Sequence, residues 1–232
     1  KILRSGVVIF PGSNCDRDMI VALRQITGKT PIKIWHKEND FPNLDLIVVP
    51  GGFTFGDYLR CGALAARSPV ISSIKNHISR GGTVLGVCNG FQILIEAEIL
   101  PGSLIRNKKL LFTCRETTLE VQNCIKNPFL SGFKIGECLK IPVAHNEGNY
   151  FAPKELLKQL KEEGRIALKY SKQNNSEKNY NPNGSSDDIA GILSTNGRVL
   201  GMMPHPERAI NYLHGGTDGL KLLTNCVEQI IG

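Results

Sequence analysis

The sequence predicts an α/β protein with a mostly parallel sheet flanked by helices and antiparallel β additions in its second half. Two observations predict this class. In the first half, short strands that are apolar on both faces alternate with helical patterns, which is typical of a parallel sheet covered by helices. After Pro101 the strand-like segments become longer and of mixed polarity, which is typical of antiparallel strands. No repeat or linker interrupts the 232 residues, so we expect a single domain over 1–232.

The elements of the first half follow from apolar runs and their boundary residues. The helix that starts near Ser13 and Asn14 has acidic residues in its first turn and closes at Gly28. A later helix opens with Ser68 and Pro69 and ends on glycines. We expect strands at 5–10, 31–35, 44–50 and 83–87 and helices at 13–28, 68–82 and 89–100.

The second half contains the antiparallel additions. An Asn-Gly pair at 196–197 between two apolar runs is a strong β-hairpin signal. The polar, Asn-rich stretch 172–187 predicts a loop. We expect strands at 110–123, 133–145 and 165–171, a hairpin over 188–204, and helices at 153–164 and 217–231.

Composition excludes several classes of protein. No apolar run is long enough to span a membrane. The apolar run at the N-terminus is too short for a signal peptide. Because the sequence begins with Lys1 rather than Met, we expect residues to precede it. The net charge is +7, but the lysines are dispersed, which favours a solvated surface over a nucleic-acid site and leaves open a docking face for an acidic protein.

The seven cysteines are odd in number and scattered, and no CxxC pair occurs among them. This pattern favours a reduced, cytoplasmic protein over a disulfide framework or a zinc site. We therefore expect no metal, and we expect most of the thiols to be small buried hydrophobic groups.

One cysteine stands where a strand turns into a helix. Gly86-Val87-Cys88-Asn89-Gly90 has the spacing of a nucleophile elbow, in which glycines flank a strained nucleophile because side chains would collide there. The following helix N-terminus favours a thiolate, the reactive form. The alternative is a buried cysteine in an ordinary turn.

A thiol nucleophile needs a base, and the chain has five histidines: His36, His77, His145, His205 and His214. His77 is expected on a helix surface. His205 follows an apolar strand and lies between two prolines, and Glu207 is placed to orient its ring, as in catalytic triads. The alternative is a rigid turn with a surface ion pair. Together with the elbow, the pattern favours a Cys88–His205–Glu207 triad.

Main-chain donors for an oxyanion are also present. Gly51 and Gly52 end an apolar strand at the expected active edge of the sheet, where glycine leaves an N–H open to a substrate. The N–H of Asn89, directly after the nucleophile, is the second candidate. The alternative is an ordinary glycine turn.

These pieces, in this order, resemble the class I (triad) glutamine amidotransferases, which have a flavodoxin-like fold. The matching motifs are Pro50-Gly51-Gly52, Gly86-x-Cys88-x-Gly90-x-Gln92 and His205-Pro206-Glu207. The resemblance implies a glutaminase in which Cys88 forms a thioester with glutamine. It also implies that Gln92 binds glutamine, although a structural polar residue on the helix remains an alternative.

Longer blocks resemble one branch of these enzymes, the glutaminase subunits of phosphoribosylformylglycinamidine synthase. They are FPGSNCDRD (10–18), PGGFTFGDYLRCGA (50–63), HNEGNY (145–150), NPNGS (181–185), IAGI (189–192) and MMPHPER (202–208). This resemblance implies L-glutamine as substrate, two partners (a PurL-type synthetase and a small protein of the PurS type), and no cofactor on this chain. ATP and Mg would be used by the synthetase, in line with the absence of a GxxxxGK[ST] loop.

The resemblance also implies that the isolated chain is slow without its partner. The loop with Phe53, Phe55 and Tyr58 is expected to line the site and face the synthetase, with local packing as the alternative. His145 and Glu147 are expected at the active-site mouth or the partner face. Three other interpretations stay open: a glutaminase for a different synthetase, a DJ-1-like redox protein, and a non-catalytic binding protein that keeps the fold.

Overall fold

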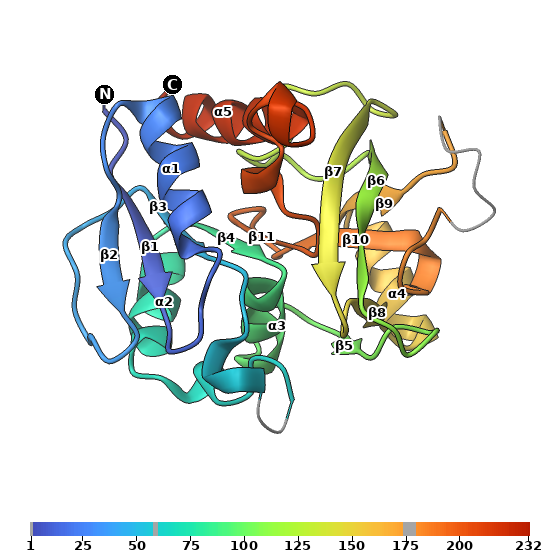
Figure 1. Ribbon diagram of the computed structural model, residues 1–232, viewed down its shortest axis with the longest axis horizontal. Helices are drawn as coiled ribbons and strands as arrows, with labels where there is room; N and C mark the ends of the chain where they lie inside the picture. The colour runs from blue at the N-terminus through green and yellow to red at the C-terminus, as the bar shows by residue number, and fades with distance from the viewer. Residues whose placement is uncertain (1, 58–59, 174–179) are drawn as a thin grey trace.

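The computed structural model describes residues 2–57, 60–173 and 180–232. A nine-stranded sheet crosses the molecule in the order β2-β1-β3-β4-β11-β10-β9-β6-β7 (Figure 1). Its strands are β1 (Ser5–Ile9), β2 (Ile32–Trp35), β3 (Leu46–Val49), β4 (Thr83–Val87), β6 (Thr113–Val121), β7 (Cys138–His145), β9 (Ile166–Tyr170), β10 (Ile189–Leu193) and β11 (Val199–Met202). The helices are α1 (Asp16–Thr27), α2 (Val70–Ser79), α3 (Asn89–Glu96), α4 (Lys154–Glu162) and α5 (Asp218–Ile231).

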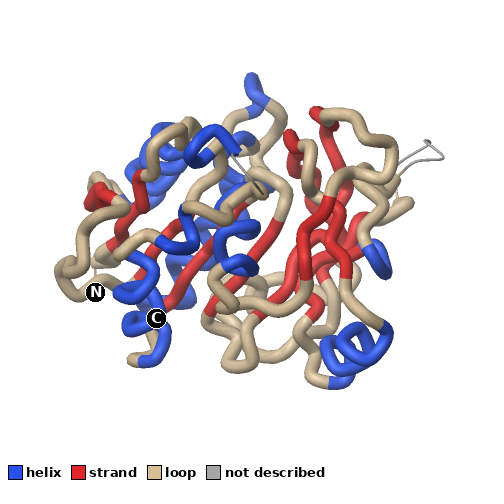
Figure 2. Tube along the Cα trace, turned by 90° about the horizontal axis from the view of Figure 1, so that it is seen from below, coloured by secondary structure: helices blue, strands red, loops and turns tan. Residues whose placement is uncertain are grey.

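Five neighbouring strands, from β2 to β11, run parallel, as the sequence predicts. Strands β3, β4 and β11 are buried along their whole length, which explains their continuous apolar sequences. Since β1 to β2 and β3 to β4 cross the sheet in opposite directions, right-handed connections place α1 and α2 on opposite faces. Helices α1, α2 and α3 gather around this parallel half (Figures 1 and 2).

The remaining strands are antiparallel, which confirms the predicted additions. The hairpin of β10 and β11 turns at Gly197, whose φ of 68° is in the left-handed region. Strand β7 begins at Cys138 rather than at 133, because the preceding residues form a turn in which Glu137 N–H donates to the Lys134 carbonyl. The short antiparallel pair of β5 (Ser103–Ile105) and β8 (Asn149–Phe151) was not predicted.

Helix α1 begins three residues later than predicted, and its start has no side-chain cap. The hydroxyl of Ser13 instead donates to the carbonyl of Gly51, 3.4 Å away, so a tertiary contact takes the group that was expected to cap the helix. The C-terminal end is as predicted, because Gly28 adopts the left-handed conformation and its N–H donates to Arg24.

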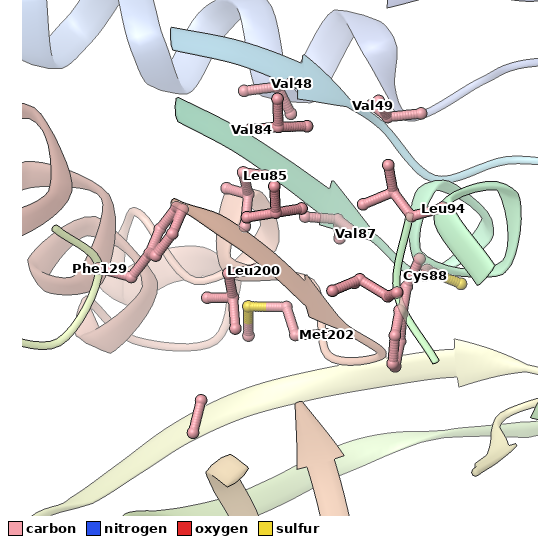
Figure 3. Close-up of a cluster of buried hydrophobic side chains, with 14 of the residues drawn as sticks. Val48, Val49, Val84, Leu85, Val87, Cys88, Leu94, Phe129, Leu200 and Met202 are labelled. Carbon is pink, nitrogen blue, oxygen red and sulfur yellow. The ribbon is translucent and has the colours of Figure 1, made fainter. Parts of the chain in front are cut away.

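The core that positions the site lies between α3 and the strands β3, β4 and β11 (Figure 3). Leu85 pairs in register with Val48 on one side and Leu200 on the other. Phe91 of α3 is fully buried and packs over Gly201, where any Cβ would collide with its ring. The first turn of α3 lies against the end of β3 in the same way, because a Cβ on Gly90 would overlap the Val49 carbonyl oxygen.

Among the residues that the structure describes, no helix is long and apolar enough to cross a membrane.

The Gly90→Ala substitution should destabilise the fold by about 3 kcal/mol, because its Cβ meets rigid backbone at Val49 rather than a movable side chain. Gly28→Ala is the matched control: its Cβ would meet no atom within 4 Å, and only the left-handed φ of 69° is unfavourable, by roughly 1 kcal/mol. Urea unfolding of both variants measures the difference. Equal destabilisation by the two substitutions would show that α3 can move away from β3.

Candidate active site

Cys88 lies on a strained reversal between β4 and α3. Its φ of 51° and ψ of −108° are unusual for a residue with a side chain. A Cβ on Gly86 would collide with the Leu94 side chain and lie 3.0 Å from the Gly90 carbonyl oxygen. The two glycines flanking Cys88 are therefore required by close packing, as at a nucleophile elbow.

The Cys88 thiol faces a cavity at the carboxyl edge of the parallel strands, and its Sγ lies 3.6 Å from the carbonyl oxygen of Ala144. The cavity is lined by Asn14, Cys15, Gly52, Phe53, Asp57, Cys61, Cys88, Gln92, Phe112, Cys114, Ala144, His145, Asn146, Glu147, His205 and Arg208. Segments from both halves of the chain thus meet around one sulfur.

His205 and Glu207 form a buried pair on this cavity. Nδ1 of His205 lies 2.6 Å from Oε1 of Glu207, and the two residues are 1% and 2% exposed. The N–H of His205 donates to Pro142 on β7, which fixes the segment after β11. Among the described residues, His205 Nε2 has no hydrogen-bond partner. Burial lowers the pKa of His205, but the Glu207 carboxylate and the Cys88 sulfur raise it well above its ordinary value.

A second histidine forms part of the cavity wall. His145, at the end of β7, is 3% exposed, and its Nδ1 lies 3.1 Å from Oδ1 of Asn107. Burial, reinforced by the nearby His205, lowers the pKa of His145 to about 4. His145 is therefore neutral at pH 7, and it is buried in the cavity wall rather than exposed at its mouth.

The two predicted oxyanion glycines lie beside the same groups. A Cβ on Gly51 would lie 2.7 Å from the His205 ring and 3.4 Å from Cys88, so only glycine allows this approach. The Gly51 carbonyl accepts hydrogen bonds from the Cys15 N–H and the Ser13 hydroxyl. Gly52 lines the cavity with a φ of 142°. Gly51 therefore lies against Cys88 and His205, and Gly52 lines the cavity that the Cys88 thiol faces.

Asn89 and Gln92, on the first turn of α3, tie two loops together. The side chain of Asn89 accepts from Thr54 N–H at 3.2 Å and donates to Gln92 Oε1 at 2.8 Å. The Gln92 amide then donates to the Glu147 carbonyl at 2.7 Å. Gln92 does line the cavity, but both ends of its amide have partners within the chain. The structural alternative for Gln92 is thus realised, and a glutamine-binding role remains a prediction.

Sequence reasoning gave no role to Cys15 and Arg208, which the structure places against the triad. Arg208 Nη2 donates to Cys15 Sγ at 3.1 Å. Atoms of Cys15, His205 and Glu207 lie within 4.8 Å of one another, a donor set of the kind that binds metals. However, the guanidinium on the sulfur opposes a further cation, and the His205–Glu207 hydrogen bond occupies two of these groups. A signal was present in the sequence, because Arg208 directly follows the His-Pro-Glu motif.

Part of the cavity wall is acidic. Asp57 and Glu147 line it together with Cys61. Of the aromatic residues expected in this loop, Phe53 lines the cavity and is 47% exposed, whereas Phe55 packs edge-on against His36. The third, Tyr58, lies outside the described residues.

Two expectations about individual side chains were wrong. His77 is 4% exposed rather than on the surface, because Nε2 hydrogen-bonds the Thr83 carbonyl and the ring fills the space above Gly82. Most of the cysteines are not buried hydrophobic groups: all seven are free, but only Cys15, Cys88 and Cys226 are buried. Four of the seven, including the buried Cys15 and Cys88, line the cavity.

Comparison with known proteins agrees with this geometry. Residues 3–217 match the model of the CobB/CobQ-like glutamine amidotransferase domain. A chain in the structure of PurLQS from Thermotoga maritima superposes with a TM-score of 0.86 at 38% identity, covering 98% of this chain and 99% of that one. Another glutamine amidotransferase from Thermotoga maritima shares the fold, with a TM-score of 0.63 at 15% identity over 100% of this chain and 99% of that one. The chain belongs to the glutamine amidotransferases of this family.

The curated relatives narrow the family further. Phosphoribosylformylglycinamidine synthase subunit PurQ of Brucella suis is 50% identical over 226 residues, 97% of this chain and 98% of the relative. The PurQ protein of Ruegeria pomeroyi is 52% identical over 95% of both chains. The protein is thus a member of the PurQ family, which favours the glutaminase interpretation over the redox alternative.

The two histidines that line the cavity should have pKa values shifted in opposite directions. Nitrogen NMR at pH 7 should show His205 protonated and His145 neutral. By linkage, the His205 contribution to stability is complete below pH 6.5 and is lost as the pH rises through the raised pKa. For His145, stability falls as the pH decreases from 6.5 towards 4.

Replacing Glu207 tests why the pKa of His205 is higher than that of His145. Glu207→Gln removes the charge that raises the His205 pKa most and leaves the burial that lowers it, so the His205 pKa should fall relative to the wild type. Glu162→Gln, which changes an exposed carboxylate on α4, is the control and should leave both titrations unchanged. A wild-type His205 that is neutral at pH 7 would contradict the assigned charge state.

Proposed function

We propose that this chain is the glutaminase subunit of phosphoribosylformylglycinamidine synthase, in which it hydrolyses L-glutamine to glutamate and ammonia. The observation that carries the proposal is the strained Cys88 thiol facing the same cavity as the buried His205–Glu207 pair. A nucleophile, an oriented base and main-chain donors are the groups that acyl transfer from an amide requires. Membership in the PurQ family supports glutamine as the amide.

In the proposed mechanism, Cys88 attacks the side-chain carbonyl of glutamine as a thiolate, and main-chain N–H groups near Gly52 and Asn89 stabilise the oxyanion. His205, already protonated through its contact with Glu207, donates its proton to the departing ammonia. This leaves a γ-glutamyl thioester on Cys88. His205, now neutral, accepts a proton from water, whose attack releases glutamate and restores the Cys88 thiolate beside a protonated His205.

The ammonia is used by a partner. Relatives are subunits of a synthase, and one structural relative is part of PurLQS. We therefore assign a PurL-type synthetase as partner, with a PurS-type protein in the same complex. The synthetase would convert formylglycinamide ribonucleotide to formylglycinamidine ribonucleotide with ATP and Mg, while this chain uses no cofactor. The seven free cysteines support a cytoplasmic complex.

The rim of the cavity offers an apolar surface for that partner. Leu110 and Leu111 are 73% and 66% exposed and directly precede Phe112, which lines the cavity. Phe53, on the other loop of the cavity, is 47% exposed. Apolar side chains grouped at the mouth of a site mark an interaction surface. Docking there would place the synthetase over the site where ammonia is produced.

The glutamine mimic 6-diazo-5-oxo-L-norleucine should label Cys88 alone, and excess glutamine should prevent the labelling. Mass spectrometry of peptides locates the adduct, and addition of the PurL-type partner should raise the labelling rate. Cys15, in the same cavity, is the internal control for specificity. An unlabelled Cys88 in the assembled complex would overturn the glutaminase proposal.

Leu111→Asp should weaken binding to the synthetase roughly tenfold, as expected when an exposed apolar contact becomes charged. Ile135→Asp is the matched control, because Ile135 is 68% exposed but precedes β7 at the end remote from the cavity. Binding is measured by titrating the partner, and urea unfolding of the free chain checks that the fold is intact. The docking surface is misplaced if both variants bind equally well.

A further inference from the structure

The cavity wall contains two carboxylates that the proposed reaction does not use. Asp57 and Glu147 both line the cavity, together with the Cys61 thiol. Burial, followed by the two negative charges, raises the pKa of Cys61, so this thiol stays neutral. Burial also raises the pKa of Asp57; the Cys61 hydrogen bond opposes this, and the nearby Glu147 adds to it.

These carboxylates are incompletely compensated within the described part of the chain. Oδ1 of Asp57 is shielded from solvent and has no hydrogen-bond partner there. Glu147 Oε1 lies 3.8 Å from Nε of Arg106, but that side chain is 77% exposed and such a pair contributes little. A shielded acceptor beside a like charge is unfavourable unless a ligand supplies a positive donor.

A second side chain of the cavity wall also has an unpaired atom. His205 Nε2 belongs to a side chain that is 1% exposed, and it too lacks a partner among the described residues. The same cavity is therefore lined by a side chain with an unpaired ring nitrogen and by one with an unpaired carboxylate oxygen. A ligand that satisfies both has a neutral amide at one end and a cation at the other.

The sequence spacing limits how far apart these groups can lie. Cys88 Sγ lies 3.6 Å from the Ala144 carbonyl oxygen, and Glu147 follows three residues later, so its backbone is at most roughly 11 Å from Ala144. In glutamine, the amide carbon and the α-nitrogen are roughly 5 Å apart along an extended chain of ordinary bonds. The size of an amino acid amide is compatible with this limit.

We propose that Asp57 and Glu147 bind the α-ammonium group of the substrate and so select free α-amino acid amides. This inference rests on the proposed glutaminase function and adds the groups that determine its specificity. An ammonium has three donors and no acceptor, which matches carboxylate oxygens and the unpaired Asp57 Oδ1. The hydrogen-bond network of Asn89 and Gln92 holds both carboxylate-bearing loops against the elbow helix.

The test compares L-glutamine with glutaramate, which has the same amide and carboxylate but no α-ammonium group. In the assembled complex, Asp57→Asn and Glu147→Gln should each lower kcat/KM for glutamine about tenfold to a hundredfold, mainly through KM. Neither should change kcat/KM for glutaramate more than about twofold. Glu162→Gln on α4 is the control and should change neither substrate.

Binding to the Cys88→Ala protein separates recognition from chemistry, because this variant cannot form the thioester. In EDTA it should bind glutamine more tightly than glutaramate, and adding Asp57→Asn or Glu147→Gln should abolish the preference. Equal losses of affinity for both compounds would show that the carboxylates have only a structural role, and would overturn the inference. A preference that appears only with added Mg²⁺ would assign the pair to a metal and also overturn it. Failure of the glutaminase proposal would appear differently, as a wild-type complex that binds glutamine but never labels or turns over at Cys88.

Discussion

The reversal of the backbone at Cys88 is the constraint on which the rest of the site depends. A left-handed φ at a non-glycine residue costs about 1–3 kcal/mol, so packing elsewhere must enforce it. Helix α3 does this by burying Phe91, Ile93 and Leu94, each worth roughly 1.5–3 kcal/mol. The free energy gained by burying these side chains therefore exceeds the cost of the strained backbone at Cys88, provided that α3 can approach β3 as closely as Gly90 permits. The reactive position and the core packing are thus one structural feature.

Strand direction then assembles the site. Strand β4 lies between β3 and β11, and all three run parallel. Their carboxyl ends therefore lie at the same edge of the sheet. The three segments that leave these ends carry Gly51, Cys88 and His205. The antiparallel half supplies the opposite wall: β7 ends at His145, and its Pro142 carbonyl holds the N–H of His205. The additions after Pro101 therefore complete a cavity that the parallel sheet alone would leave open.

The sequence predicts the features that arise from local spacing. The elbow needs only residues 86–90, the His205–Glu207 pair needs residues two apart, and the hairpin turns on Gly197. Contacts between distant segments were missed. Arg208 meets Cys15 across 193 residues, and β5 pairs with β8 through registers that neither short segment indicates. Ser13 was misjudged for the same reason, since its partner Gly51 lies 38 residues away. His77 was misjudged although its partners, Gly82 and Thr83, are near in the sequence, because the chain turns back over its ring after α2.

The charges of the cavity form a pattern that follows from burial. Protonating two buried histidines that interact is unfavourable, and of these two only His205 has a carboxylate partner among the residues that the structure describes. His145 is therefore neutral, and His205, beside the nucleophile, is the one of the two that is protonated. Arg208 adds positive charge beside Cys15 and the triad, whereas Asp57 and Glu147 add negative charge to the cavity wall. In a medium of low dielectric constant, such charges orient a ligand more strongly than they would in water, so the proposed contact of Asp57 and Glu147 with the substrate ammonium group would leave the amide end free to approach Cys88 before any bond forms.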